Sequence, residues 1–395
     1  MSAEVPSRPL EPLPAWSQEH PLVPRVAVPH DITGEPPALG QPVHRLSGMT
    51  MGTTWSVALV GPPGLRLAAI EAAVLRVCND VIAEMSQWTP ESILSRFNRA
   101  ASGSDHAVPE GFARVLSAAL DIAALSDGAY DPTAGELVGL WGFGPSGLPA
   151  SSDVHMDTAD SFDAAADTDA DPVAVRTSTS TSTWLRHDDP EFRLPTPEQC
   201  TQAHCGWQSL RWDAQRRVLT QPGRATLDLS AIAKGDAVDR LSDLLTGLGL
   251  PHHLVEVGGE LRGAGLKPDG QPWWVDLEPP QPDSALPPMR VALHGLSVAT
   301  SGDYRKTYQD AQGQRISHTV DPRQRRPVSH GLASVTVLHP SAMWADGWST
   351  ALMVLGTDDG MRLAEQQQLA ARLVVRRPSG GFDEHLSSAL QALLI

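Results

Sequence analysis

Residues 332–355, LASVTVLHPSAMWADGWSTALMVL, contain the two adjacent elements on which the fold prediction rests. Leu332 to Leu338 is rich in valine and other apolar residues, which predicts a strand. Pro340 ends that run, and Met343 to Leu355 is predicted to be a helix. The stretch therefore indicates a strand that leads directly into a helix.

The chain on both sides of this stretch is rich in predicted strands. The residue types predict strands at residues 253–257, 291–298 and 316–320 before it. After it, residues 363–368 are predicted to be helical and residues 372–376 to form a strand. The second half of the chain is thus dominated by strands.

The first half has one predicted strand and is otherwise mainly helical. Met51 to Val60 is predicted to be a strand that ends at the Gly-Pro-Pro turn of residues 61–63. Apolar residues at helical spacing predict helices at residues 65–85, 112–125 and 231–248. Strands and helices come in uneven runs instead of strict βαβ alternation, and no segment repeats at a fixed period. This order predicts an α+β fold.

The composition excludes several functional classes. The chain has 395 residues, three cysteines and a net charge of −16. Cys78, Cys200 and Cys205 are too few for a disulfide framework, and their spacing does not fit a zinc ribbon. The acidic charge argues against a nucleic-acid-binding surface, which needs clustered lysine and arginine. No apolar run approaches about 18 residues, so no transmembrane helix is predicted.

Residues 1–45 are rich in proline and have no helical or strand period. Their composition predicts a disordered leader or an extended arm packed on the domain. They contain no basic segment followed by an apolar one, no cleavage site and no cysteine for lipid attachment. We therefore expect a cytoplasmic protein. The alternative, a periplasmic lipoprotein at the inner membrane, requires a different start site.

A second unusual segment lies at residues 146–195. Seven aspartates occur from Asp153 to Asp171 without a lysine or arginine, and threonine alternates with serine from Thr177 to Thr183. The residue order of a calcium-binding loop is absent. We expect a solvated, low-complexity surface insert that interrupts one catalytic domain of residues 46–395.

Six polar segments lie at the edges of predicted helices and strands. They combine Gly, Asp, Ser and Thr, and they occur at residues 131–135, 228–235, 256–260, 299–305, 317–322 and 345–350. Each has a simple structural explanation, such as a turn, a bulge, or a helix cap at Asp228 or Ser230. Lys234 alone fits a solvent-facing helix residue, and His318 alone fits a hydrogen-bonded core histidine.

Together, the six segments indicate phosphate chemistry with a metal ion. Helix N-termini and Ser/Thr/Gly turns present free N–H groups to anions. Asp346 and Thr350 are four positions apart, so they share one face of the predicted helix. With a backbone carbonyl they would make an oxygen site suited to Mg²⁺. Neither the Rossmann nor the P-loop fingerprint is present to bind the phosphates.

The residues and the order of eight segments resemble those of the FAD:protein FMN transferases of the ApbE family. The resemblance runs from about residue 51 to about residue 376 and is interrupted by the insert. The segments are MGTTW, MSQWTPESILSRFN, DPTAGELVGLWGFGP, LDLSAIAKGDAVD, VEVGGELRGAG, ATSGDYR, SHTVDP and ADGWSTALMVLG. The resemblance implies a single ApbE-like, T-fold-related domain with mixed or antiparallel sheets and packed helices.

The resemblance also implies an activity and a set of site residues. Family members use Mg²⁺ and FAD to attach FMN to a Ser or Thr hydroxyl of a target protein, with release of AMP. The implied FAD-binding positions are Met51, Trp88, Ala129, Tyr130, Asp131, Asp228, Lys234 and Val320. The implied metal-binding positions are the carbonyl of Ala231 and the side chains of Asp346, Thr350 and Ser349. Because Ser349 stands where some relatives have Asp, its metal role is left open.

The expected catalytic residues are His318, Asp228 and Thr300. The backbone and hydroxyl groups of residues 300–302 would donate hydrogen bonds to phosphate oxygens. His318 or a nearby carboxylate would accept the proton of the incoming hydroxyl.

Two other functions stay open at this point. If the same site passed FMN to water, the protein would be an FAD pyrophosphatase. If it catalysed no reaction, the protein would be a non-catalytic FAD-binding protein. The expected partner is an acceptor protein with a flavinylated Ser or Thr, such as a respiratory or electron-transfer subunit or a reductase. No nucleic-acid partner is expected.

Overall fold

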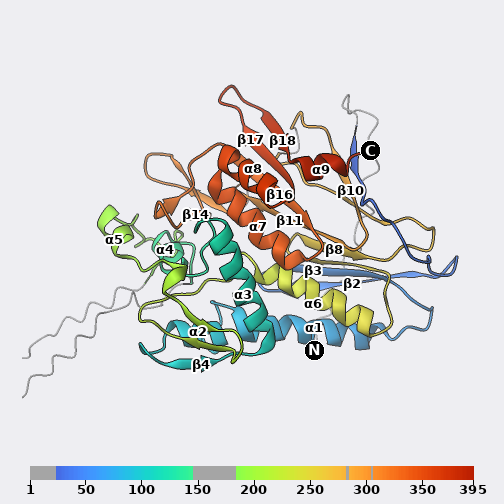
Figure 1. Ribbon diagram of the computed structural model, residues 1–395, viewed down its shortest axis with the longest axis horizontal. Helices are drawn as coiled ribbons and strands as arrows, with labels where there is room; N and C mark the ends of the chain where they lie inside the picture. Colours follow the sequence, from blue (N-terminus) through green and yellow to red (C-terminus); the bar gives the residue numbers. More distant parts are fainter. Residues whose placement is uncertain (1–23, 146–183, 282–283, 304–305) are drawn as a thin grey trace, which may run out of the picture.

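The computed structural model describes residues 24–145, 184–281, 284–303 and 306–395. Its centre is an antiparallel sheet of eight strands in the order β18-β17-β16-β11-β8-β7-β3-β2 (Figure 1). In chain order these strands are β2 Val43–Thr50, β3 Thr53–Val60, β7 His253–Val257, β8 Glu260–Ala264, β11 Leu296–Gly302, β16 Leu332–His339, β17 Ala370–Arg376 and β18 Phe382–Leu386.

Helices pack on one face of this sheet and form the larger core (Figure 1). They are α1 Leu67–Met85, α3 Glu110–Leu125, α6 Ala233–Gly247, α7 Ala342–Leu355 and α8 Thr357–Gln366. The apolar residues of each helix recur at helical spacing, so they form one stripe that faces the core. In α1, for example, Ile70, Val74 and Val81 are buried.

A second layer covers the opposite face of the central sheet. It consists of β1 Arg25–Ala27, β9 Trp273–Asp276, β10 Met289–Leu293 and α9 Ser388–Ala392. Successive side chains of a strand point to opposite faces, so Ala299 of β11 lies in the helix-side core and Val298 in the other core. The middle of the central sheet is therefore covered on both faces.

The remaining elements are short. They are α2 Ile93–Asn98, β4 Asp105–Ala107, α4 Gly135–Leu140, α5 Pro197–Gln202, the 3₁₀ turn Trp207–Ser209, β5 Arg211–Asp213, β6 Val218–Thr220, β12 Thr307–Gln309, β13 Arg315–Ser317, β14 Val320–Asp321 and β15 Arg326–Pro327.

The predicted α+β class is confirmed, but three predicted strands were wrong in extent. Residues 291–298 do not form one strand, because a turn at Gly295 with a φ of 67° separates β10 from β11. Residues 51–52 form the hairpin turn before β3 instead of its first residues. Residues 316–320 divide between β13 and β14. The predicted helix at 363–368 begins earlier, at Thr357, and forms α8.

The N-terminal segment and the insert are described in part. From Pro24 onward the chain is described, and β1 pairs in parallel with β10. Residues 1–23 and 146–183 lie outside the described residues, so the disorder expected there stays a prediction. Residues 184–195, the last part of the predicted insert, are described, and Trp184 among them is buried against Gly139 of α4.

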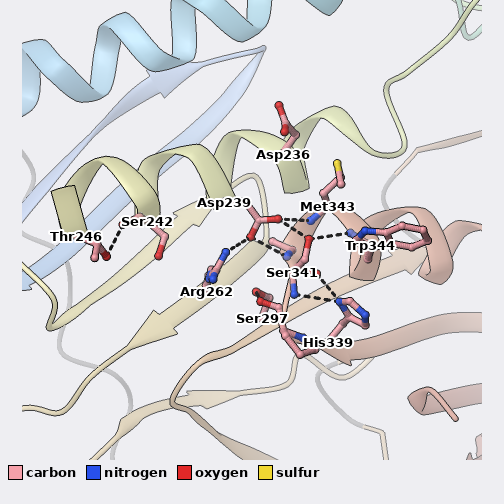
Figure 2. A network of polar contacts seen from close by, with 12 residues as sticks. Asp236, Asp239, Ser242, Thr246, Arg262, Ser297, His339, Ser341, Met343 and Trp344 are labelled. Atoms are coloured by element: carbon pink, nitrogen blue, oxygen red, sulfur yellow. Dashed lines mark hydrogen bonds and ion pairs between the residues drawn. The ribbon is translucent and has the colours of Figure 1, made fainter. Parts of the chain in front are cut away.

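One aspartate joins α6 to the start of α7 (Figure 2). Asp239 of α6 accepts hydrogen bonds from the backbone N–H groups of Ala342 and Met343, at 2.9 and 3.0 Å. The Ser341 hydroxyl donates to it at 2.6 Å, and Arg262 of β8 donates at 2.5 Å. The first N–H groups of a helix have no partner within that helix. Asp239 therefore caps α7 from the neighbouring helix.

We expect Asp239→Ala to lower the free energy of unfolding by roughly 3 kcal/mol. The substitution leaves the half-buried Arg262 side chain and the first N–H groups of α7 without their acceptor. Urea unfolding measures the change, provided that the slope of the transition stays constant. Asp243→Ala, at an exposed position of the same helix, is the matched control. Equal, small losses in both variants would show that this cap adds no stability.

Candidate active site

Two adjoining cavities, of 580 and 220 Å³, lie beside the first turn of α6 and the middle of α7. The residues that line both cavities are Ser230, Ala231, Ser301, Lys306, His318 and Thr350. The larger cavity continues along the β7–β8 turn, and the smaller one continues toward Trp88 and Tyr130. Every predicted site residue except Ser349 lines one of the two cavities, so segments far apart in the sequence meet here.

The turn before α6 contains a backbone carbonyl that is available to a ligand. It belongs to Ala231, which precedes the N-cap Ile232, and within the described ranges no hydrogen bond reaches its oxygen. The first N–H groups of a helix have no partner within that helix. One of them, the N–H of Gly235, donates to Asp346 Oδ2 of α7 at 3.1 Å. Asp346 therefore caps α6 and lines the same cavity as the Ala231 carbonyl.

Three hydroxyl groups form a chain at the same place. The Ser349 hydroxyl donates to the main-chain oxygen of Asp346 at 2.9 Å, so its oxygen accepts the proton of Ser301 at 2.8 Å. Ser301 in turn accepts from Thr350 Oγ1 at 3.0 Å. This order leaves the lone pairs of Thr350 Oγ1 available in the cavity. Ser349 is fully buried and lines neither cavity, so it acts only through its hydrogen bonds to Ser301 and to the main chain of Asp346.

The oxygen set of Ala231, Asp346 and Thr350 fits a hard divalent cation. It offers one carboxylate, one hydroxyl and one main-chain carbonyl, which are ligand types suited to Mg²⁺. In the part of the chain that the structure describes, no cluster of three or more His, Cys, Asp or Glu side chains could hold a metal. Mg²⁺ commonly binds through one or two carboxylates together with water and phosphate oxygens, so one carboxylate suffices here.

Lys234 lies between two carboxylates of the larger cavity. Its Nζ is 2.7 Å from Glu260 Oε1 and 3.5 Å from each carboxylate oxygen of Asp346. Burial opposes the charge of Lys234, but Asp346 and Glu260 outweigh burial and raise the pKa of Lys234. Burial raises the pKa of Glu260, and the Lys234 ammonium opposes that rise. Because the ammonium keeps its proton and favours the ionised form of Glu260, the 2.7 Å contact is an ion pair.

His318 carries an unprotonated ring nitrogen at the place where both cavities meet. Its Nδ1 lies 3.1 Å from the main-chain oxygen of Lys306. Because a carbonyl can only accept, Nδ1 holds the proton and Nε2 keeps its lone pair. Burial, and next the charge of Lys306, lower the pKa of His318 to about 4. The neutral imidazole can therefore accept a proton at neutral pH.

This lowered pKa predicts a pH profile. A reaction that uses His318 as a base should have nearly constant kcat/KM from about pH 6 to pH 8, and it should slow only toward pH 4. Unfolding releases the imidazole to its ordinary pKa, so stability should also fall as the pH drops from 6.5 toward 4. Steady-state rates across this range test the first expectation. A rise in rate through pH 6.5 would contradict a His318 that is neutral in this range.

The smaller cavity contains a buried hydroxyl without a partner. Tyr130 Oη is buried and makes no hydrogen bond within the described residues. Burial, and next the carboxylate of Asp346, raise the pKa of Tyr130, so the hydroxyl stays protonated. An unsatisfied buried donor costs free energy, which a ligand with a matching acceptor would recover. Trp88, 52% exposed, offers an aromatic face in the same cavity.

Two predicted aspartates shape the wall of the smaller cavity. Asp228 accepts from the N–H of Ser230 at 2.8 Å, and the Gln87 amide lies 3.4 Å from the other oxygen of Asp228. Asp131 accepts from the backbone N–H of Thr133 at 2.8 Å. Neither Asp228 nor Ser230 caps α6, whose N-cap is Ile232. Ala129 and Val320 line the same cavity.

Thr300 and Ser301 lie on opposite faces of the central sheet. The Thr300 hydroxyl bonds to Thr336 of β16 at 2.9 Å, whereas Ser301 reaches the hydroxyls of α7. Thr300 lines the larger cavity, as does Met51 of the β2–β3 turn. The structure thus brings Ser301, and not the hydroxyl of Thr300, into contact with Thr350.

The residues of the cavity walls that the predicted site lacks include Gln87, Glu260 and Lys306. Gln87 directly precedes the predicted site residue Trp88, and this position was the only hint to it in the sequence. Glu260 opens β8 directly after the two glycines of the β7–β8 turn, and a charged residue at the start of an apolar strand was its signal. No pattern in the sequence identifies Lys306.

A family model described as the ApbE family matches the chain in two segments, residues 51–179 and 156–373. The chain belongs to the ApbE family. A FAD:protein FMN transferase of Salmonella typhimurium is 33% identical over 350 residues, covering 89% of this chain and 89% of that protein. Another, of Vibrio cholerae, is 35% identical over 350 residues, covering 88% of this chain and 92% of that protein.

Solved structures of the ApbE family share the fold. The apo form of the flavinyl transferase ApbE of Pseudomonas stutzeri has a TM-score of 0.73 and 33% identity, covering 89% of this chain and 97% of that chain. The flavin transferase ApbE of Vibrio cholerae has a TM-score of 0.70 and 32% identity, covering 89% of this chain and 99% of that chain. The resemblance drawn from the eight sequence segments is confirmed.

Among the described residues, no helix has both the length and the apolar character required to cross a membrane.

Proposed function

We propose that this chain is a Mg²⁺-dependent FAD:protein FMN transferase that moves FMN to a Ser or Thr hydroxyl of an acceptor protein and releases AMP. The observation that carries the proposal is one cavity lined by His318 and by three oxygen ligands, the unbonded Ala231 carbonyl, the Asp346 carboxylate and the Thr350 hydroxyl. The curated relatives bear the name of the same activity.

The metal position in this proposal consists of the Ala231 carbonyl, the Asp346 carboxylate and the Thr350 hydroxyl. Mg²⁺ bound there would supply positive charge to offset the pyrophosphate and the departing AMP. Ser301 and Ser349 orient the Thr350 hydroxyl through the chain described above. Lys234 adds a second positive charge to the wall of the same cavity.

His318 is proposed as the base. The acceptor hydroxyl oxygen bonds to the phosphorus on the FMN side, and the P–O bond of the pyrophosphate to AMP breaks. The hydroxyl proton moves to His318 Nε2, and AMP leaves with the bridging oxygen. The Lys306 carbonyl keeps Nδ1 protonated and so fixes the tautomer that this step needs.

FAD is proposed to occupy both cavities. The unpartnered Tyr130 hydroxyl and the exposed face of Trp88 give the smaller cavity a donor and a stacking surface for a planar ring. Met51, Ala129, Asp131, Asp228, Lys234 and Val320 would complete the FAD contacts as cavity-lining residues.

The test is one incubation of the protein with FAD, Mg²⁺ and a candidate acceptor domain. A mass increase of one FMN group on an acceptor Ser or Thr, with release of AMP, is the expected result. FMN and AMP in solution without acceptor labelling would show an FAD pyrophosphatase. Bound but unchanged FAD, without either product, would show a non-catalytic FAD-binding protein.

The acceptor and the location are also proposals. We propose an acceptor among respiratory or electron-transfer subunits and reductases, which is what the family resemblance implies. We keep the expectation of a cytoplasmic location. Fusions to reporters that work on only one side of the membrane test it.

A further inference from the structure

Glu260 holds the ammonium of Lys234 more closely than Asp346 does. The Nζ–Oε1 distance to Glu260 is 2.7 Å, a short charged hydrogen bond, whereas both Asp346 oxygens lie at 3.5 Å, beyond the usual range for N–H···O bonds. Lys234 is thus displaced toward β8 and away from α7. The carboxylate of Asp346 keeps lone pairs that a closer ammonium would occupy.

The position of Glu260 is fixed by the fold. It is the first residue of β8, directly after the β7–β8 turn, and only 4% of it is exposed. Its Oε1 meets Lys234, and its Oε2 is buried without a hydrogen-bond partner within the described residues. A buried carboxylate with one unsatisfied oxygen is costly unless its charge is used nearby. The ion pair with Lys234 compensates the cost of burying the Glu260 charge.

We propose that Glu260 is a positioning residue that holds Lys234 away from Asp346 and so keeps the Asp346 carboxylate open to a divalent cation. This inference rests on the metal position of the proposed function. It assigns Glu260 an effect on cation affinity that acts through Lys234 and does not require Glu260 to contact the cation.

Mn²⁺ binding to the full chain without FAD, followed by electron paramagnetic resonance, tests the proposal. Glu260→Gln keeps the shape of the side chain but removes its charge, so Lys234 should move to Asp346. We expect the Kd for Mn²⁺ to rise at least tenfold. Glu256→Gln removes a charge from the wall of the same cavity at the other end of the turn, and it should change the Kd less than threefold.

The double variant Glu260→Gln, Lys234→Met separates the two ways in which Glu260 could act. If Glu260 acts through Lys234, the double variant should bind Mn²⁺ within threefold of Lys234→Met alone, because no ammonium is left to compete. If the double variant stays tenfold weaker than Lys234→Met, Glu260 acts directly on the cation and the proposal is overturned. An unchanged Kd in Glu260→Gln also overturns it.

Failure of the metal position itself looks different. A wild-type chain that binds no Mn²⁺ would overturn the metal position of the proposed function and this inference with it. A wild-type chain that binds Mn²⁺, with Glu260→Gln variants indistinguishable from it, would overturn only the role of Glu260. Unchanged circular dichroism in each variant shows that the differences do not come from unfolding.

Discussion

Asp346→Ala should reduce FMN transfer at least about 10³-fold at every Mg²⁺ concentration tested. Asp346 supplies the only carboxylate among the three proposed metal ligands. Without it, a hydroxyl and a carbonyl are left, and neutral oxygens alone hold Mg²⁺ weakly.

The loss should exceed that of a single ligand, because the same carboxylate also caps the start of α6. In Asp346→Ala the N–H of Gly235 has no acceptor on α7. The first turn of α6, next to the Ala231 carbonyl, then loses a contact that holds it to α7. We therefore expect added Mg²⁺ to restore little activity.

Asp346→Asn separates these two effects. The amide oxygen can still accept from the N–H of Gly235, so the helix end keeps its form while the charge is lost. We expect an intermediate loss that high Mg²⁺ partly reverses. Asp358→Ala, at an exposed position of α8, is the control and should retain full activity. The mass of the acceptor measures FMN transfer. A transfer rate of Asp346→Ala within tenfold of the wild-type rate would refute the metal position.

His318→Gln should lower kcat for transfer by about 10²- to 10⁴-fold while the Kd for FAD changes less than threefold. The glutamine side chain offers no basic nitrogen in place of Nε2. Binding and catalysis should therefore separate. Fluorescence quenching of FAD measures binding, and single-turnover labelling of the acceptor measures transfer.

The control for this variant is His385→Gln, at an exposed position of β18. It should leave both constants unchanged. If His318→Gln weakens FAD binding as much as it lowers kcat, His318 binds FAD and is not the base. If kcat stays within threefold of wild type, another group takes the proton.

The sequence predicts the long elements of this fold well and the short ones poorly. Helices α1, α3, α6 and α7 carry apolar stripes over many turns, so their periodicity survives small errors at their ends. The run at residues 291–298 misleads because one apolar stretch contains a turn at Gly295 and supplies strands to two sheets. Local residue types cannot show that change of partner.

The candidate site shows the same limit. Asp346 and Thr350 are predictable as a pair because they are close in sequence and share a helix face. The choice between Thr300 and Ser301 depends on which face of the central sheet β11 turns to α7, which is set by pairing with β8 and β16. The role of Glu260 depends on Lys234 of another element. The orientation of β11 and the pairing of Glu260 with Lys234 both depend on tertiary contacts, which the local sequence of either segment does not show.

The hydrogen bond from Gly235 to Asp346 has a consequence for how this protein is made. The two residues are 111 positions apart, so α6 is synthesised before α7, which supplies Asp346. Until α7 is in place, the N–H of Gly235 has no acceptor on that helix. A nascent chain that has not yet made α7 would thus lack Asp346 and Thr350 of the proposed metal position. Competence for catalysis would arrive in one late step, when α7 docks.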